Sequence, residues 1–353
     1  MNFRAGKEKD FFKFISSLDE KDKIGLVSHT DLDGICSASI VAKVLDPDKV
    51  ELINYDYEKL ENVIKEMRGK EINKIVFTDI NFNGKEKIIE DLNKFEDVLI
   101  IDHHEFSKDI NSNKIHFFNT ESDIPASYCS HYLFSKVREI PRFIPALGII
   151  ADLPHLYNKD NGNEVFRDFN LGEKEEGSEI DIREESVRMG RALIYVKSGE
   201  NSGPDLKDIY ESFVDAENTG DLEELHKYGE EVGKEIEDKL DEYKEEKEVE
   251  GGLVIFEFES RFFIKGAIIN EVSTKEENKG KIFVFLREDE GKVNVSVRSQ
   301  EKRVDSPNLL KEALKGIPKS DSGGHKAAAG AILPKEYKDK FKENLKEVYR
   351  NLD

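Results

Sequence analysis

The stretch VLIIDHH at residues 98–104 joins a run of four apolar residues to three titratable side chains, Asp102, His103 and His104. A run that is apolar throughout, rather than alternating, indicates a strand buried on both faces. Strands of this kind belong to parallel sheets that helices cover on both sides. The stretch therefore predicts such a sheet, with three polar groups where one of its strands stops.

Other apolar runs in the first 155 residues repeat this pattern, and segments of helical periodicity separate them. They are IGLVSH (24–29), VELIN (50–54), KIVFTD (74–79), KIHFFN (114–119) and ALGIIAD (146–152). Strands that alternate with helices predict a doubly wound α/β domain with a mainly parallel sheet, which we assign to residues 1–200. Within it, residues 155–203 are polar and turn-rich.

The second part of the chain changes character twice. Residues 205–247 are dense in Glu and Lys, with apolar residues at helical spacing, and we expect a charged helical connector over 201–250. The strand-like runs GLVIFEF, KIFVFLRE and KVNVSVRSQ follow it, and the last alternates with period two. Residues 251–353 are therefore expected to form a smaller α+β domain whose sheet is solvated on one side.

Composition narrows the functional classes. The net charge of −21 disfavours nucleic acid as a partner, because phosphate binding depends on Lys and Arg. The charge is uneven, however: residues 251–353 hold 20 Lys plus Arg against 17 Asp plus Glu, or +3, which leaves −24 for residues 1–250. No apolar run reaches 18 residues and no apolar leader opens the chain, so we expect a soluble cytoplasmic protein without membrane contact.

Carboxylates and imidazoles follow four of the predicted strands. They are His29, Asp31 and Asp33 in SHTDLDG, then Asp79, then Asp102, His103 and His104, and finally Asp152. Ligands of open parallel sheets bind beyond the carboxyl ends of the strands, so groups up to 123 positions apart can converge there. A single Asp at such a place is more often a helix cap, but the adjacent histidine pair is harder to explain structurally.

Converging carboxylates repel one another unless a cation compensates. Mixed Asp and His ligands suit Mn²⁺, Mg²⁺ or Zn²⁺, and the two cysteines, Cys36 and Cys129, offer no thiolate cluster. Because the candidates outnumber the ligands of one tetrahedral ion, we expect two divalent ions that share a carboxylate.

The motifs HTDLDG, Asp79, DHH at 102–104 and G-x-x-A-D at 148–152 resemble those of the DHH phosphoesterase superfamily. In the second part, GGHKAAAG (323–330) and VSVRS (295–299) resemble the signature of the DHHA1 domain. This combination is similar to archaeal RecJ-like exonucleases, including the Hef-associated nuclease group. Oligoribonucleases and cyclic-dinucleotide phosphodiesterases share it too.

The resemblance implies a role for each motif residue. The metal ligands would be His29, Asp31, Asp33, Asp79, His103 and Asp152, with two Mn²⁺ ions, or Mg²⁺, bridged by Asp79. His29 departs from the spacing usual in the family, since it stands two residues before Asp31. His104 would face the substrate phosphate and Asp102 would support it, so that His104, Asp79 and Asp102 form the catalytic set.

In the predicted second domain, the resemblance assigns substrate binding to Arg298, Gly323, Gly324 and His325. Glycines let a backbone approach a phosphate closely, and Arg offers it a planar fork. A turn that enters a strand of small residues is the structural alternative for GGHKAAAG. Phe262 and Phe263 can stack on bases, although at least one of them is expected in the core.

Together these features predict an exonuclease that hydrolyses single-stranded DNA or RNA by two-metal activation of water. The 3′→5′ polarity that we expect is implied only by the resemblance to archaeal members of the family. DNA repair or nucleic-acid turnover is the expected setting, with a repair or replication helicase or nuclease as partner and a homo-oligomer as a possible state. The alternative is an oligoribonuclease or cyclic-dinucleotide phosphodiesterase. A type II pyrophosphatase fits the second domain worse, and a non-catalytic scaffold is disfavoured because every expected ligand position is filled.

Overall fold

The computed structural model describes residues 1–54, 57–152, 168–169, 181–199, 203–301 and 304–352. Most of the polar stretch at 155–203 lies outside these ranges. The chain divides into two compact units, of which the first comprises residues 1–196 and 200–229. The second comprises residues 197–199 and 230–353, and each unit is described by itself below. None of the described helices is both long enough and apolar enough to cross a lipid bilayer.

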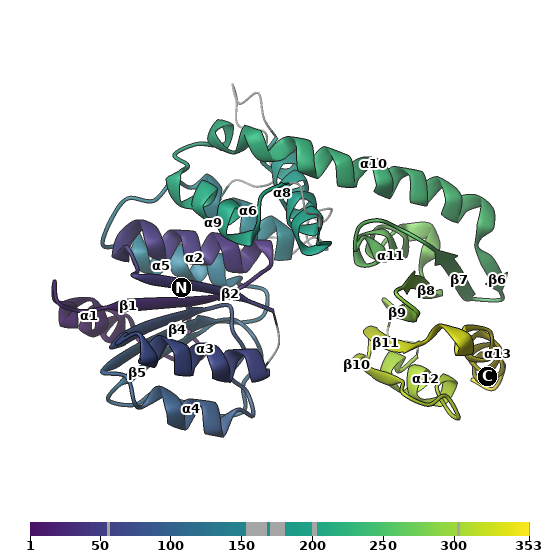
Figure 1. Cartoon of the computed structure of the whole chain (residues 1–353), viewed down its shortest axis with the longest axis horizontal. Helices are drawn as coiled ribbons and strands as arrows, with labels where there is room; N and C mark the ends of the chain where they lie inside the picture. Colours follow the sequence, from purple (N-terminus) through teal and green to yellow (C-terminus); the bar gives the residue numbers. More distant parts are fainter. Residues whose placement is uncertain (55–56, 153–167, 170–180, 200–202, 302–303, 353) are drawn as a thin grey trace. The chain divides into compact units, whose positions relative to one another are not determined.

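The first unit is built on a five-stranded parallel sheet (Figure 1). Its strands are β1 (Ile24–His29), β2 (Lys49–Ile53), β3 (Lys74–Thr78), β4 (Asp97–Asp102) and β5 (Ile115–Asn119). They lie in the order β2-β1-β3-β4-β5, so the chain winds outward in both directions from β1 and β3. This confirms the predicted doubly wound α/β fold and the strand positions inferred from the apolar runs that form these five strands.

Helices cover both faces of this sheet. They are α1 (Glu8–Ser17), α2 (Leu32–Leu45), α3 (Tyr57–Gly69), α4 (Glu86–Leu92), α5 (Ala126–Phe134), α6 (Phe143–Asp152), α8 (Ile182–Lys197) and α9 (Leu206–Asp215). One core lies between the sheet and α2, and a second lies between the other face of the sheet and helices α3 and α4. Two buried faces explain why the strands are apolar throughout.

One expected strand is a helix instead. The run ALGIIAD at 146–152 forms most of α6, which packs against α2 and α5 with Leu147 and Ile149 fully buried. A segment that is apolar on all sides suits a buried helix as well as a buried strand, and periodicity does not separate the two. Asp152 therefore comes to the site from a helix end.

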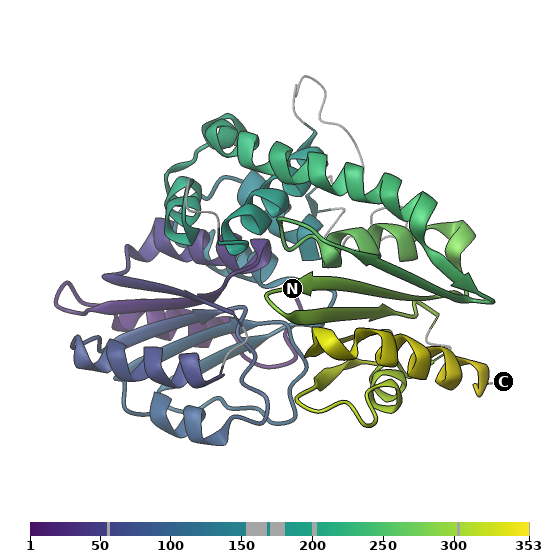
Figure 2. The same ribbon diagram turned by 45° about the vertical axis from the view of Figure 1, so that its right-hand side comes forward.

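The second unit contains a six-stranded mixed sheet in the order β10-β11-β9-β8-β7-β6 (Figure 2). The strands are β6 (Glu248–Glu250), β7 (Leu253–Phe258), β8 (Ile282–Asp289), β9 (Lys292–Arg298), β10 (Asp321–His325) and β11 (Ala328–Pro334). The helices are α11 (Lys265–Ser273), α12 (Ser306–Ala313) and α13 (Lys338–Arg350), and short 3₁₀ turns lie at Glu276–Asn278 and Lys335–Tyr337.

The expectation of a sheet solvated on one side holds only for part of this unit. β9 alternates as predicted, with Val293, Val295 and Val297 buried between more exposed residues. β8, in contrast, is buried from Ile282 to Arg287. Its Phe285 packs against Tyr243 of α10 (Glu223–Glu246), while α12 and α13 enclose a core with the sheet.

The predicted connector is divided between the units. α9 belongs to the first unit, where Ile209 and Phe213 are buried in its core. A 3₁₀ turn at Thr219–Leu222 leads into α10, which contains the boundary between the units at Gly229 and Glu230. The part of the connector that leads into the second unit is thus one charged helix.

The turn from β1 into α2 requires glycine at position 34. A Cβ on Gly34 would lie 2.3 Å from the backbone oxygen of His29. The carbonyl oxygen of Gly34 accepts a hydrogen bond from Ser28 Oγ at 2.8 Å, and the N–H of Gly34 donates to Asp31 Oδ1 at 2.9 Å. The close contact is with backbone, so it cannot be relieved by rotating a side chain.

We expect Gly34→Ala to destabilise the protein by about 1–3 kcal/mol, the usual cost of forcing extra atoms into a packed region. Urea denaturation followed by circular dichroism measures this change. The control is Gly190→Ala in α8, where a Cβ meets nothing within 4 Å, and there we expect a stabilisation of up to about 1 kcal/mol. Equal stability of the Gly34→Ala variant and the parent would contradict the proposed constraint.

Candidate metal centre

The carboxyl ends of β1, β3 and β4 bring polar groups to one edge of the first sheet. His29 ends β1, Asp79 follows β3, and Asp102 ends β4. The N–H of Asp79 donates to the carbonyl of Ile101 at 2.9 Å, which continues the β3–β4 pairing by one residue. Asp79 then leaves the strand with a φ of 56°. This left-handed conformation is uncommon for residues other than glycine and often marks functional sites.

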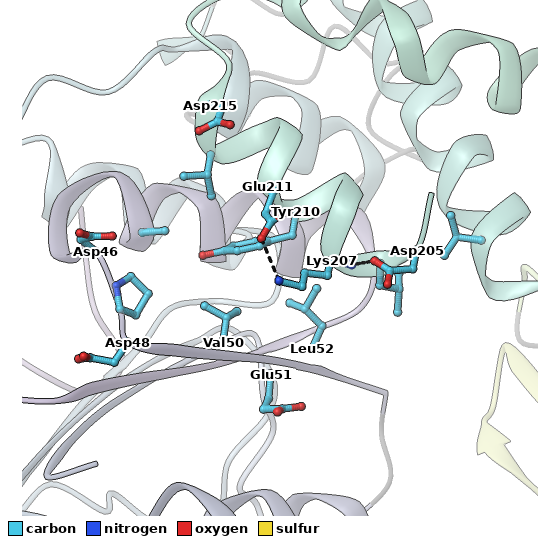
Figure 3. A pocket seen from close by; sticks show the side chains of 15 residues that line it. Asp46, Asp48, Val50, Glu51, Leu52, Asp205, Lys207, Tyr210, Glu211 and Asp215 are labelled. Carbon is cyan, nitrogen blue, oxygen red and sulfur yellow. Dashed lines mark hydrogen bonds and ion pairs between the residues drawn. The ribbon is translucent and has the colours of Figure 1, made fainter. Parts of the chain in front are cut away.

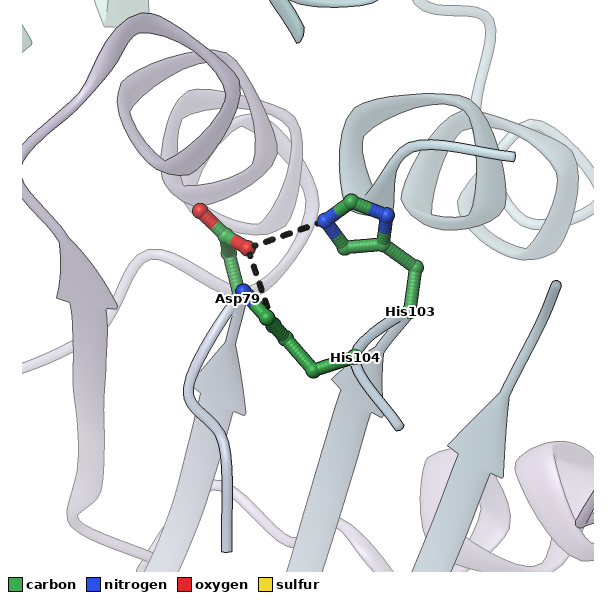
Figure 4. A group of neighbouring side chains, drawn as sticks. All are labelled: Asp79, His103 and His104. Carbon is green, nitrogen blue, oxygen red and sulfur yellow. Dashed lines mark ion pairs between the residues drawn. The ribbon is translucent and has the colours of Figure 1, made fainter. Parts of the chain in front are cut away.

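The Asp79 carboxylate lies between imidazoles on both sides. Its Oδ1 is 3.5 Å from His103 Nε2 and 3.8 Å from His104 Nδ1. Dashed lines mark both contacts in Figure 4. Its Oδ2 is 3.4 Å from His29 Nδ1, which is also 2.9 Å from Asp31 Oδ2. Two trios of possible ligand atoms result, each within 4.8 Å: Asp79 with His103 and His104, and Asp79 with His29 and Asp31. Asp79 is common to both.

Asp33 and Asp152 lie beside these trios. The two oxygens of Asp33 accept hydrogen bonds from the N–H groups of Ala126 and Ser127 at 2.9 and 3.0 Å. Asp33 therefore sits at the N-terminus of α5, where the helix dipole favours a negative charge. Asp152 Oδ2 is 3.8 Å from His103 Nδ1. All predicted residues of the first domain thus come together, although not all within one trio.

Asp102 fixes the orientation of His104. The Nδ1 of His104 lies 2.7 Å from Asp102 Oδ1, and its backbone oxygen accepts from Asn119 Nδ2 at 2.9 Å. Asp102 is buried, whereas the His104 side chain is 29% exposed. An Nδ1–H that donates to Asp102 fixes the tautomer and the orientation of the imidazole ring.

Burial and crowding perturb the site's titration. Burial, reinforced by neighbouring carboxylates, raises the pKa of Asp33 and Asp79, and it raises the pKa of Asp152 to about 6. Burial lowers the pKa of His29 and His103, but the adjacent carboxylates outweigh it and raise each pKa to about 10. Protons therefore compensate the carboxylates in the metal-free protein. This donor set of carboxylates and imidazoles fits a hard or borderline divalent ion such as Mn²⁺, Mg²⁺ or Zn²⁺.

In the second unit, strand pairing aligns two of the predicted positions, Arg298 and His325, on either side of Ala328. Arg298 of β9 pairs with Ala328 of β11, and Ala328 pairs with His325 of β10. Gly324, at φ 138°, cannot accept a Cβ, which would lie 2.5 Å from the oxygen of Ala328. Gly323 has open space beside it. GGHKAAAG is therefore a tight β-hairpin that requires Gly324. Substrate binding by Gly323, Gly324 and His325 stays a prediction.

Two cations near Arg298 were missed at the sequence level. Lys265, the first residue of α11, lies close enough to Arg287 and Arg298 for their charges to act on it. Burial and these two charges lower its pKa to about 7. The sequence shows only that residues 260–270 contain two cations, Arg261 and Lys265, and no acid, in a chain with 75 acidic residues. It gives no sign that Lys265 meets Arg287 and Arg298. Phe262 is core, as expected for one of the pair, and Phe263 is 46% exposed with Arg287 at 4.6 Å from its ring.

The two units correspond to known domain families. Residues 23–151 match the N-terminal domain of the DHH family, and residues 263–351 match the DHHA1 domain. The chain therefore contains a DHH domain followed by a DHHA1 domain, and the resemblance of its motifs to these two domains is confirmed. The likeness to archaeal and Hef-associated nucleases stays a prediction. None of the curated proteins matches the chain in sequence.

Solved structures share its fold at low identity. Exonuclease RecJ bound to manganese has a TM-score of 0.68 at 16% identity, with 99% of this chain and 95% of that chain covered. CDC45 from Entamoeba histolytica has a TM-score of 0.64 at 10% identity, covering 96% and 98%. The pGpG-specific phosphodiesterase PggH from Vibrio cholerae has a TM-score of 0.54 at 13% identity, covering 93% and 99%. The fold alone is therefore compatible with several functions.

Binding of Mn²⁺ to the metal-free protein at pH 7 should release about two protons, because His29 and His103 are protonated there and an imidazole ligand must be neutral. Affinity should rise between pH 6 and pH 8, since both pKa values lie above this range and each proton becomes easier to displace. Calorimetry in buffers of different ionisation enthalpy counts the protons. An Mn²⁺ affinity that does not change with pH would contradict this assignment. The Asp79→Asn variant should bind Mn²⁺ far more weakly than the parent.

Proposed function

We propose that the protein is a metal-dependent exonuclease that hydrolyses single-stranded DNA or RNA, with 3′→5′ polarity. One observation carries the proposal: the buried carboxylate of Asp79 belongs to both trios of possible ligand atoms. One carboxylate between two donor sets is the arrangement expected of a two-metal hydrolase. The fold of manganese-bound RecJ supports it. DNA repair or nucleic-acid turnover, with a repair or replication protein as partner and possible self-assembly, is part of the same proposal.

His29, Asp31, Asp79 and His103 would hold the ions, and Asp33 and Asp152 lie near enough to complete the set. Mn²⁺ or Mg²⁺ ions bound there would supply the Lewis acidity that lowers the pKa of water and neutralises charge on a phosphate. The surrounding burial strengthens these interactions, because water does not screen them. Nothing in this scheme requires a nucleophile from the protein.

His104 is proposed to act on the substrate. Burial lowers its pKa, but the hydrogen bond to Asp102 outweighs this and raises it, which favours the protonated ring. A protonated imidazole held by Asp102 can donate from Nε2 to a phosphate oxygen whose charge grows in the transition state. Asp102 acts through His104 and positions it.

The second unit is proposed to bind the rest of the strand. Arg298 and Lys265 offer positive charge for phosphates, and the Phe263 ring is exposed enough for a base to stack on it. Because residues 1–250 carry −24 and residues 251–353 carry +3, the second part of the chain is the better place to hold a polyanion.

A phosphodiesterase for short substrates is the second candidate, and the fold of PggH favours it. The shared fold of CDC45 also leaves a non-catalytic scaffold to be considered. The gathering of every predicted ligand in the first unit speaks against the scaffold, because buried carboxylates without a functional reason are costly.

We expect Asp79→Asn to reduce hydrolysis by at least about a thousandfold and His104→Ala by about a hundredfold to a thousandfold, since the first removes the shared ligand and the second a transition-state donor. Strands of DNA and RNA labelled at either end, with Mn²⁺, Mg²⁺ or chelator, measure rate, polarity and length preference. The exposed Glu139→Gln is the control and should retain full activity. Activity that survives complete chelation would refute the metal mechanism, and a preference for dinucleotides would favour the second candidate.

Lys265 should make substrate binding depend on pH. Its charge declines as pH rises through about 7, so KM for a single strand should increase between pH 6 and pH 8. Lys265→Met should raise KM about tenfold at pH 6 with little change in kcat, because a hydrogen bond to a charged group contributes about 1.5–3 kcal/mol. Lys265→Arg should flatten the pH profile, since Arg stays charged. An unchanged KM in Lys265→Met, matching the exposed control Lys311→Met, would contradict this role.

A further inference from the structure

A groove in the first unit runs along β2, and none of the candidate metal ligands lines it. Its volume is about 940 Å³, near the upper end of the roughly 300–1,000 Å³ typical of ligand sites. β2 forms its base, and α9 and the end of α2 form its other walls. Figure 3 shows Tyr210 of α9 above the strand.

The groove lies at the open edge of the sheet. Among the described strands, β2 pairs only with β1 and is the last strand of its sheet. The groove is lined by Val50, Glu51 and Leu52 in succession. Successive side chains of a strand point to opposite faces, as Figure 3 shows for Glu51 against its two neighbours. A hollow that touches both faces must extend past the strand edge, where backbone N–H and C=O groups have no partner strand.

The rim of this groove is acidic. Six carboxylates line it against one cation, Lys207, which already pairs with Glu211 at 3.2 Å. Within the described part of the chain, four of the six have no Lys or Arg within ion-pair distance: Asp46, Asp48, Asp205 and Asp215. The apolar residues Val50, Leu52, Val196 and Val214 lie among them.

These features select the kind of occupant. The groove's carboxylates belong to neither group of possible metal ligands found in the described residues, so a single ion does not explain them. Nucleic acid is repelled by the same charges. The open strand edge suits an extended chain. The apolar residues beside that edge suit apolar side chains of such a chain, and the separated acidic groups suit basic side chains that alternate with them.

We propose that this groove binds a basic peptide segment of a partner protein as an added strand on β2. Backbone hydrogen bonds to the β2 edge would provide affinity, and alternate side chains would provide specificity. Apolar residues of the peptide would contact Val50 and Leu52, and its Lys or Arg residues would face the acidic rim. The site is separate from the proposed hydrolysis, so its test does not depend on nuclease activity.

The test uses the full chain and a fluorescein-labelled decapeptide of alternating valine and lysine, followed by fluorescence anisotropy at low salt. We expect saturable binding that weakens with salt, and no binding of the valine–glutamate counterpart. Asp46→Asn combined with Asp215→Asn should weaken binding about tenfold, because it removes two negative charges from the rim. The fold should be retained, because Asn also tolerates the left-handed backbone at position 46. Two further peptides carry N-methyl groups on the odd-numbered or on the even-numbered residues. One of the two should not bind, because its methyl groups remove the N–H groups along the edge that faces β2.

The control is Glu20→Gln combined with Glu139→Gln, which removes the same charge from exposed positions outside the groove. This pair should keep the affinity within about twofold. Equal loss in both double variants would show non-specific attraction and overturn the proposal. Insensitivity to N-methylation in both registers would overturn strand addition, and displacement of the peptide by spermine at equal concentration would assign the groove to polyamines instead.

Discussion

The first unit depends on holding several carboxylates together where water is largely absent. Asp33 and Asp79 are both buried, and burial raises the pKa of both carboxyl groups. Repulsion from Asp79 adds to the rise at Asp33, and repulsion from Asp31 adds to the rise at Asp79. Without a metal, the protein meets this cost with protonated histidines on either side of Asp79. Divalent ions can replace those protons. The ordinary demand for charge compensation thus prepares the site for cations before any substrate arrives.

The surrounding fold maintains this arrangement through backbone groups more than through other charged side chains. The N-terminus of α5 holds Asp33 with two N–H donors, and the β1–α2 turn holds Asp31 through Gly34. A Cβ on Gly148 of α6 would lie 2.6 Å from Ser127 Oγ and 3.1 Å from Asp33 Oδ1, so this glycine permits the helices to approach. Fixed backbone dipoles stay in place when protons and cations exchange, which suits a site that must bind either.

The sequence predicted the parallel sheet because strands buried on both faces leave an unmistakable apolar run, as in residues 98–101. It did not separate strand from helix in ALGIIAD, where every face is apolar. The site residues were predictable because carboxyl ends of parallel strands meet at one edge. The role of Lys265 was not predictable, because its neighbours Arg287 and Arg298 lie 22 and 33 positions away in the sequence. Only the folded sheet brings their charges together. The division of the connector was hidden for the same reason: tertiary packing alone places Phe213 in the first core.

The charge distribution connects the site with the proposed division of labour. A concentration of carboxylates binds cations well and repels a polyanion, so the same part of the chain cannot easily do both tasks. Residues 251–353 carry +3 and contain the cations Lys265, Arg287 and Arg298, whose mutual repulsion a bound phosphate would relieve. Under the proposed function, opposite electrostatic requirements favour two units over one: an acidic unit that would retain metal and a weakly basic unit that would retain the strand. Since the fold is shared with both RecJ and CDC45, these charges and the ligands around Asp79 carry the functional argument, and the architecture does not.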